Sequence, residues 1–471
     1  MKYLFLTFFM FSSVLISAQQ LTLKKGIVTD SLIVANASNE TFSVYLPTSY
    51  TTEKTWPIIV IFDSEGRGKI VTQLFKKIGE EQGYIIAASN NVSKDLDLLK
   101  NVEIGDRLIE TVQAYFSIDK NAIYTTGSNA GAEAAMAVSA IRTDIKGVMA
   151  IGDFWINSEF LKKNKGYAFV GMIDYKDPDY YRLSDISSYI SKIGYPSRIY
   201  SFTSAKEYPS ADLIYSGISE FTLQRLKSDS TVNGNSAQKL FEYDLRIAEN
   251  LRRKLSFYEA YEFLDLMSQK FPVEGSQDII REMQKEIKKN KIYRSQRRNF
   301  AKAITTENIK KSEFSYYLAD DLAQINFENL GYWNQQIKEL EENKGSENIA
   351  EARMGYRLQG YLQNMAQLSL VQFEEQGSSI DLLVFTAVLQ TIFDKENPKG
   401  YFKVISLSAS DGDYETALLY LEDLLKTGYD NLDALYTIPG TLDLKLSPEY
   451  NKVIRKYLGR SKFYNLNLEE N

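Results

Sequence analysis

The sequence of 471 residues contains neither cysteine nor histidine. Without cysteine, the chain cannot form disulfides, thiolate metal sites or a thioether lipid anchor. Without histidine, it lacks the group that most enzymes use as a general base near neutral pH, which excludes a Ser-His-Asp mechanism. A zinc site would need carboxylates alone, and these suit calcium or magnesium better. We therefore expect no metal site and no cofactor.

The chain also lacks a large excess of charge. Its formal net charge is −6, and hydrophobic and charged residues make up 44% and 25% of the sequence, close to the average of globular proteins. This composition is typical of neither a disordered chain nor a polytopic membrane protein. Because the net charge is negative, nucleic acid is not an expected partner. At this length we expect two or three domains.

Long apolar runs are confined to the N-terminus. The segment "MKYLFLTFFMFSSVLISAQQ" has a basic residue at Lys2, an apolar run up to Ile16, and small residues at Ser17 and Ala18. This order predicts a secretory signal peptide over residues 1–18. A retained membrane anchor is less favoured, because a spanning helix needs ~20 apolar residues. We expect an exported protein of the periplasm or outer-membrane periphery, or a secreted one, with no transmembrane span in the mature chain.

Two kinds of pattern divide the rest of the chain. Between Leu21 and Phe221, β-rich runs such as "PIIVIFD" and "GVMAIGD" alternate with amphipathic stretches, which is typical of a mostly parallel sheet covered on both faces. An antiparallel strand pair is expected at its start. From about Ser236 onward the spacing is helical. The predicted fold class is therefore α/β plus all-α. The predicted parts are an α/β domain over 19–226, a linker over 227–238 and a helical domain over 239–471.

One segment of the helical domain, Tyr401 to Leu425, has the pattern of a helical hairpin. Two apolar-periodic helices flank a turn that contains glycine, and a small residue lies where the helices would cross. The segment resembles a tetratricopeptide repeat (TPR). The resemblance implies a TPR-like helical domain that binds a protein partner in the cell envelope on its concave surface. The residues expected to form the repeat packing are Tyr401, Gly412, Tyr414, Ala417 and Leu421.

A sharp turn is predicted within "IYTTGSNAGAEAAMAV", which begins at Ile123. Gly127, Asn129 and Gly131 occupy the G-x-S-x-G pattern that ends a strand and begins a helix, with asparagine in the place of serine. Together with "FSVYLPTSYTTEKTWPIIVIFDSEGRG", this segment resembles the α/β-hydrolase family, in particular secreted feruloyl esterases and polyester depolymerases. The resemblance implies an α/β-hydrolase-like doubly wound sheet. The composition, rich in Tyr, Phe and Lys, and the signal ending "ISAQQ" are similar to exported proteins of Bacteroidetes-type bacteria.

The resemblance also places the other two members of a catalytic triad. The acid would fall at Asp174, after the strand "YAFVGMID", or at Asp177, and Lys206 stands in the place of the histidine. An amide at Asn129 cannot attack an ester. The triad positions Asn129, Asp174 and Lys206 are therefore degenerate, and no catalytic residue is expected. In a simpler interpretation, which is favoured, Asp174, Asp177 and Asp179 form a turn and cap the helix that follows.

Two further residues are candidates for the site. Ser128 adjoins the apex and could act with Lys206 as a Ser-Lys dyad. However, neighbouring residues at a strand end point in opposite directions, which favours a packed Ser128 that faces away from the site. Glu65, in the loop after a central strand, could line a vestigial pocket with Asn129, Asp174 and Lys206. Such a mixed polar pocket suits a carbohydrate better than an acyl chain.

A basic segment and several aromatic residues allow two interpretations each. Lys285 to Lys302, "KEIKKNKIYRSQRRNFAK", could contact an acidic partner or lipid headgroups. The favoured alternative is a solvated helix face balanced by the acidic "ELEENKGSENIAEA" further on. Trp333 and many tyrosines could stack on sugars, but their helical spacing favours the core or an interface.

Three functions are consistent with the sequence. The favoured one is a catalytically inactive α/β-hydrolase-like envelope protein, a pseudoenzyme that scaffolds or binds a protein partner through its helical domain. The first alternative is a secreted serine esterase-type hydrolase with a non-standard catalytic constellation. The second is a carbohydrate- or acyl-ligand-binding module that uses the vestigial pocket.

Overall fold

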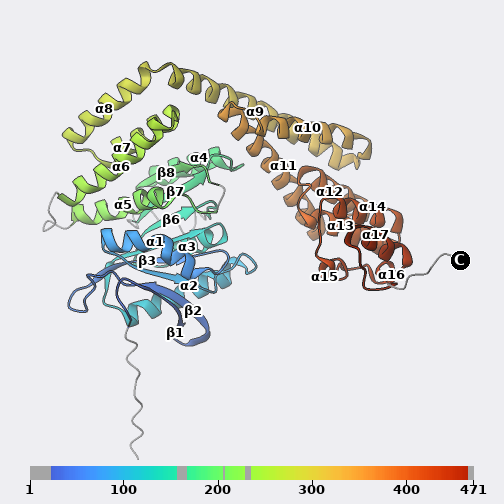
Figure 1. Ribbon diagram of the computed structural model, residues 1–471, viewed down its shortest axis with the longest axis horizontal. Coiled ribbons are helices and arrows are strands. Elements are labelled where there is room, and N and C mark those ends of the chain that lie inside the picture. The colour runs from blue at the N-terminus through green and yellow to red at the C-terminus, as the bar shows by residue number, and fades with distance from the viewer. Residues whose placement is uncertain (1–22, 156–166, 205–206, 229–234, 465–471) are drawn as a thin grey trace, which may run out of the picture. The chain divides into compact units, whose positions relative to one another are not determined.

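The computed structural model describes residues 23–155, 167–204, 207–228 and 235–464 (Figure 1). The predicted signal peptide lies outside these residues. The α/β part contains an eight-stranded sheet in the order β1-β2-β4-β3-β5-β6-β7-β8. The strands are β1 (Val28–Val34), β2 (Ala37–Tyr45), β3 (Trp56–Phe62), β4 (Ile85–Ser89), β5 (Ile118–Ser128), β6 (Ile145–Ile151), β7 (Ala168–Asp174) and β8 (Ser197–Phe202).

The centre of the sheet is parallel and its N-terminal edge is antiparallel. Strands β4, β3, β5 and β6 pair in parallel, whereas β2 pairs antiparallel with both β1 and β4. Every residue of β3 and β4 is buried, because a parallel sheet is covered by helices on both faces and its strands are continuous apolar runs. The predicted α/β class and the antiparallel pair at the start are confirmed.

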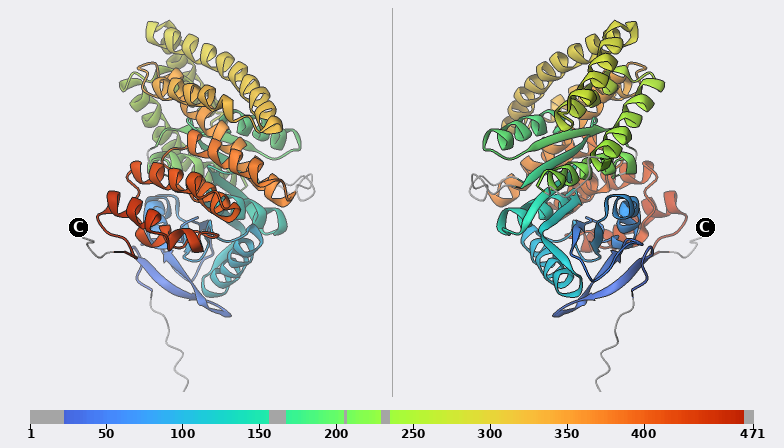
Figure 2. Two further views of the ribbon diagram at one scale, coloured as in Figure 1. Left: turned by 90° about the vertical axis from the view of Figure 1, so that its right-hand side faces the viewer. Right: turned by 90° about the vertical axis from the view of Figure 1, so that its left-hand side faces the viewer.

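Among the described residues of the first unit, the helices that pack against this sheet are α1 (Gly68–Gln82), α2 (Leu98–Tyr115), α3 (Ala130–Ile141) and α5 (Ala211–Ser228). Helix α1 packs against α5, and α2 packs against α3 (Figure 2). The first pair is joined by buried hydrogen bonds, in which Gln82 Nε2 donates to the Tyr215 carbonyl and the Thr222 hydroxyl donates to Gln82 Oε1, at 3.1 and 2.7 Å. Buried polar groups are thus paired where these helices meet.

The chain divides into two compact units. The first comprises Met1–Val170, Gly194–Pro196 and Ser210–Thr231, and the second comprises Gly171–Ile193, Ser197–Pro209 and Val232–Asn471. These units differ from the predicted ranges 19–226 and 239–471, because the segments after β7 and β8 pack with the helices of the second unit. Helix α5 ends at Ser228 and α6 begins at Asn235, so helical structure reaches into both ends of the predicted linker.

Apart from β8 and the end of β7, the second unit is helical. Side-chain caps mark several helix starts, for example Ser379 before α12, Asn397 before α13 and Ser447 before α17. Its helices are α4 (Tyr180–Lys192), α6 (Asn235–Arg253), α7 (Phe257–Lys270), α8 (Glu274–Lys289), α9 (Lys291–Gln324), η1 (Phe327–Asn329), α10 (Leu330–Lys344), α11 (Ile349–Glu375), α12 (Ile380–Phe393), α13 (Pro398–Asp411), α14 (Tyr414–Lys426), α15 (Leu432–Leu435), α16 (Leu442–Lys445) and α17 (Pro448–Leu458).

Two apolar clusters hold these helices together. One lies mainly among α9 to α12 and includes Trp333, which is fully buried. Its indole N–H donates to Asp321 Oδ2 at 2.8 Å, so the polar end of the ring is satisfied. The second cluster lies among α13 to α17. The assignment of Trp333 to a core is confirmed. Within the described ranges, no helix combines the length and apolarity needed to cross a membrane.

Candidate functional site

The turn between β5 and α3 consists of Asn129 alone. Its backbone has φ 48° and ψ −122°, a strained conformation that asparagine tolerates better than most residues. The Asn129 carbonyl accepts the N–H groups of Ala132 and Glu133 at 2.8 and 3.1 Å, which begins the helix. This is the backbone of a nucleophile elbow, in which a strand turns at once into a helix. The predicted turn at this position is confirmed.

The two flanking glycines are required by close backbone contacts. A Cβ atom on Gly127 would overlap the carbonyl group of Gly131. A Cβ atom on Gly131 would overlap the carbonyl oxygen of Phe62, at the end of β3. Both obstacles are backbone atoms, so neither can be relieved by a side-chain rotation. The elbow therefore keeps its glycines for steric reasons that do not depend on catalysis.

The apex side chain is exposed, whereas its neighbour is not. The Asn129 N–H donates to the Ile151 carbonyl at 2.9 Å, and the amide oxygen lies against Gly152, where a Cβ atom would overlap it. Ser128 has no exposed surface and pairs with Ile151 across the sheet. An amide at the apex can donate and accept hydrogen bonds but cannot act as a nucleophile.

The loop after β3 approaches the elbow from the neighbouring strand. The buried Asp63 carboxylate accepts the backbone N–H groups of Glu65 and Arg67 at 3.3 and 2.9 Å. It also accepts Arg67 Nε and Nη2 at 2.8 and 2.7 Å. In hydrolases of this fold, a loop at this position and the residue after the apex supply the backbone donors of the oxyanion hole. Asp63 holds this loop in place here.

Two glutamates lie close in sequence to these segments. Glu65 is in the loop after β3, and Glu133 follows the apex in the first turn of α3. Glu65 Oε1 lies 2.6 Å from Lys94 Nζ, and both side chains are exposed. Glu133, in the first turn of α3, is half-buried. Burial raises the pKa of its carboxyl group, and the charge of Asp153 raises it further. Glu65 is thus neutralised by Lys94, and burial disfavours the charged form of Glu133.

Asp174, the predicted acid, belongs to the second unit and stabilises a turn. Its Oδ1 accepts the N–H of Lys176 at 2.8 Å, and its Oδ2 accepts the N–H of Ser204 at 3.0 Å. Asp177 Oδ1 accepts the N–H of Asp179 at 2.8 Å, and α4 begins at the next residue. These contacts are those of the predicted turn. The predicted cap is not observed, because the Asp179 side chain at the N-cap position forms no capping hydrogen bond with α4. Lys206 lies outside the described residues.

The turn after β7 is fastened to the helices by a buried arginine. Arg357, on α11, donates through Nη1 to the Tyr175 carbonyl at 2.6 Å. Its Nε and Nη2 both donate to Glu307 Oε2, on α9, at 2.9 and 2.7 Å. The side chains of Arg357 and Glu307 are 2% and 0% exposed. Lys311 bridges the same groups, since its Nζ lies 3.0 Å from Glu307 Oε1 and donates to the Pro178 carbonyl at 3.2 Å.

A second arginine of α11 reaches the segment after β8. Arg353 Nη2 donates to the Thr203 hydroxyl at 3.1 Å and pairs with Glu259. The guanidinium lies 3.9 Å from the centre of the Tyr175 ring, a cation–π contact in a desolvated position. The two segments in which a hydrolase carries its acid and its histidine are thus held by side chains of α11. Sequence reasoning missed Arg353, Arg357 and Glu307.

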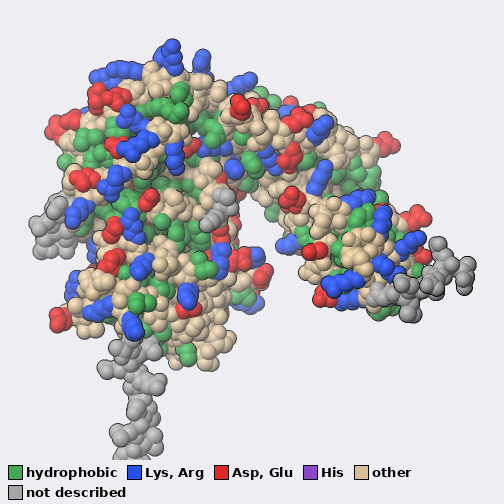
Figure 3. Space-filling model, viewed as in Figure 1, with side chains coloured by type: hydrophobic (Ala, Val, Ile, Leu, Met, Phe, Trp, Pro, Cys, Tyr) green, Lys and Arg blue, Asp and Glu red, His purple; other side chains and the backbone are tan. Residues whose placement is uncertain are grey.

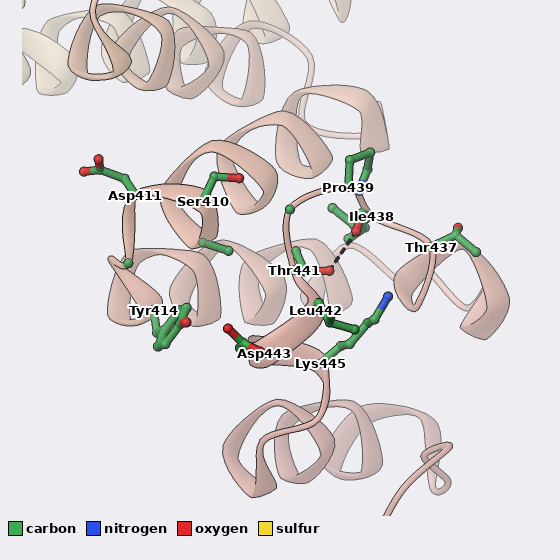
Figure 4. Close-up of a pocket in the computed structure, with 13 residues that line it drawn as sticks. Ser410, Asp411, Tyr414, Thr437, Ile438, Pro439, Thr441, Leu442, Asp443 and Lys445 are labelled. Atoms are coloured by element: carbon green, nitrogen blue, oxygen red, sulfur yellow. Dashed lines mark hydrogen bonds between the residues drawn. The ribbon is translucent and has the colours of Figure 1, made fainter.

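The C-terminal hairpin contains a cavity of ≈ 570 Å³ between the end of α13, the start of α14 and residues 437–445 (Figure 4). Its lining is mixed, with Tyr414, Asp443 and Lys445 among the larger side chains (Figure 4). The Lys445 ammonium donates to the Tyr436 carbonyl at 3.2 Å. The volume lies within the range of small-molecule pockets, which are usually more apolar.

The predicted packing residues of this hairpin fall into two groups. Tyr401, Ala417 and Leu421 are 6%, 0% and 0% exposed and belong to one apolar cluster. Gly412 ends α13 with φ 86°, a conformation that favours glycine. Tyr414 is 41% exposed and lines the cavity, so its assignment to the packing is wrong. As the first residue of α14, it lies at the end of the helix, beyond the crossing with α13.

Replacing Gly440 with alanine is expected to lower the unfolding free energy by about 1–2 kcal/mol. Gly440 has φ 73°, and a Cβ atom there would overlap the Ser410 hydroxyl at the wall of the cavity. Thermal unfolding followed by circular dichroism measures the effect. Ser410→Ala combined with Gly440→Ala should recover part of the loss, because it removes the obstructing oxygen. No recovery would mean that backbone strain alone sets the cost.

The chain was compared with known proteins. No protein-family model matches it, and no curated protein matches its sequence. Solved structures of similar shape include the serine hydrolase FphF of Staphylococcus aureus, with 13% identity over 42% of this chain and 97% of that chain, at a TM-score of 0.34. Esterase 2 of Thermogutta terrifontis has 13% identity over 44% and 96% of the two chains, at a TM-score of 0.34. A dienelactone hydrolase from Klebsiella pneumoniae has 12% identity over 47% and 97%, at a TM-score of 0.32.

Proposed function

We propose that this chain is a catalytically inactive α/β-hydrolase-like protein of the cell envelope that binds a protein partner through its helical domain. The observation that carries the proposal is the apex of the elbow, where Asn129 has the strained backbone of a nucleophile and cannot perform its chemistry. The chain contains no histidine that could serve as the base. The envelope location rests on the predicted signal peptide alone.

The non-standard hydrolase is less well supported. Its nucleophile would be Ser128, which has no exposed surface. An ester cannot reach the Ser128 hydroxyl unless the structure around the end of β5 opens, where Ser128 pairs with Ile151 of β6. The ligand-binding alternative meets a similar difficulty, because both oxygens of Asp174 already accept backbone N–H groups. These contacts favour a structural role for both residues.

Incubation of the mature protein with a fluorophosphonate probe is expected to leave its intact mass unchanged. The probe forms a covalent adduct with an activated serine, and the proposal predicts that none is present. An active serine hydrolase in the same tube shows that the reagent is competent. An adduct that disappears in Ser128→Ala would overturn the proposal and establish the non-standard hydrolase. Ester hydrolysis that survives Ser128→Ala but requires the Asp174 carboxylate would overturn it as well.

A further inference from the structure

The corner between α8 and α9 carries a concentrated positive charge. Residues 285–302 contain eight lysines and arginines and one glutamate. All eight basic side chains are exposed, and basic side chains gather over α8 and α9 (Figure 3). The chain as a whole has a net charge of −6. This patch is therefore opposite in sign to the average surface.

The basic residues of α9 lie on one face of the helix. Lys291, Arg294, Arg298 and Lys302 are spaced by three, four and four residues, so they follow one another along a single line. From the first to the last, the helix rises about 16 Å. On α8, Lys285, Lys288 and Lys289 share a face in the same way, and the Arg294 guanidinium donates to the Lys289 carbonyl at 3.0 Å. We call these seven side chains the basic stripe.

The charge of the stripe is not cancelled by ion pairs within the described part of the chain. Lys285 lies 3.5 Å from Glu282. The other six members form no salt bridge with any carboxylate of the described residues. The acidic segment further on, which was expected to balance them, pairs elsewhere: Glu341 with Lys344, and Glu351 with the Ser346 hydroxyl. The stripe is solvated, but no ion pair with that segment neutralises it.

Within the basic segment, the apolar side of α9 is buried in the protein. Tyr293, Phe300 and Ala303 are 4%, 8% and 6% exposed. A helix that binds a membrane surface inserts an apolar face, and within residues 285–302 Ile292 is the one large apolar side chain that is exposed. The other exposed apolar side chains of these two helices, such as Ile279 on α8 and Tyr316 on α9, lie outside this segment. Binding of single-stranded nucleic acid uses exposed aromatic rings, whereas both rings of this segment are buried. The exposed side of the segment therefore presents a line of ammonium and guanidinium groups, whose charge and hydrogen-bond donors are complementary to a row of carboxylates.

We propose that the basic stripe binds an acidic polypeptide segment of a partner protein. This inference rests on the proposed function, since it names the class of partner that the helical domain takes. The guanidinium groups of Arg294 and Arg298 can each hold one carboxylate through two parallel hydrogen bonds. A helical or extended segment with several Glu or Asp side chains along one edge would pair with the stripe without any rearrangement of the buried core.

The test uses the full mature chain and a labelled peptide of about 20 residues rich in Glu and Ala, with fluorescence anisotropy at about 0.15 M salt. The stripe variant combines Arg294→Gln, Arg298→Gln and Lys302→Gln. The matched control combines Lys395→Gln, Lys399→Gln and Lys452→Gln, which are also exposed and change the net charge equally. The stripe variant is expected to bind about tenfold more weakly, and the control about as tightly as the unmodified chain. A peptide with Gln in place of Glu should not bind.

Each other outcome overturns the inference. Equal losses in both variants would show that only net charge matters, and absence of peptide binding would show that the stripe has no such ligand. Tighter binding to phosphatidylglycerol vesicles or to DNA than to the peptide would assign it to a membrane or a nucleic acid. The fluorophosphonate reaction is measured on the same samples. A covalent adduct there would refute the proposed function while leaving the peptide result to stand by itself.

Discussion

Replacing Gly131 with alanine is expected to destabilise the first unit by about 3 kcal/mol and to lower its unfolding temperature by about 6–12 °C. The new methyl group would overlap the Phe62 carbonyl oxygen, at the end of the neighbouring strand. That strand is fully buried and pairs on both sides, so it cannot move away without breaking the centre of the sheet. Thermal and urea unfolding of the purified variant measure the loss.

The matched control for this variant is Gly83→Ala. Gly83 ends α1 with φ 76°, and a Cβ atom there would meet nothing within 4 Å. It therefore tests backbone strain without a clash and should cost only about 1 kcal/mol. If Gly131→Ala lowered the unfolding free energy no more than Gly83→Ala does, α3 would not lie as close to β3 as described. The elbow geometry on which the proposed function depends would then be wrong.

The elbow could be predicted from the sequence because its determinants are local. A β-rich run, three residues in a G-x-S-x-G spacing and a helix of small residues lie within one short segment. The same holds for the turn at Asp174, since its acceptors and donors are mostly a few residues apart. The strands, too, could be located from continuous apolar runs.

The contacts that α11 forms with the segments after β7 and β8 could not be predicted from local sequence. Arg357 lies 50 residues from Glu307 and 182 residues from Tyr175 along the chain. Arg353 and Arg357 have ordinary helical spacing, and nothing local shows that they face the interior. Local pattern also explains the wrong assignment of Tyr414 to the repeat packing. Its position fits the apolar spacing of α14, but at the end of the helix its side chain is exposed.

The network around Arg357 has a consequence for the proposed function. In an active hydrolase, the acid and histidine segments must place their side chains for proton transfer. Here the main-chain carbonyls of Tyr175 and Pro178 are held by Arg357 and Lys311, and Asp174 is used in the turn. These segments belong to the second unit together with α9 and α11, so the contacts give them a structural role that needs no catalysis.

Replacing Arg357 with alanine is expected to cost about 3–5 kcal/mol of unfolding free energy, the largest effect of any exchange considered. The loss leaves the fully buried Glu307 carboxylate with Lys311 as its remaining partner and frees the Tyr175 carbonyl. Residues 174–179 should then exchange their amide hydrogens faster than in the unmodified chain. Urea unfolding and hydrogen exchange measured by mass spectrometry give the two quantities.

The control is Arg182→Ala, which removes an exposed ion pair of 2.6 Å with Asp179 and should cost less than about 1 kcal/mol. A double-mutant cycle with Glu307→Leu and Arg357→Met separates the pair from the burial. Each single variant leaves one charge of the pair without its partner in the core, whereas the double variant removes both charges. The double variant should therefore be more stable than the sum of the two single losses predicts. Additive losses would mean that the two side chains act independently. Unchanged exchange over residues 174–179 in Arg357→Ala would show that the turn stands without α11.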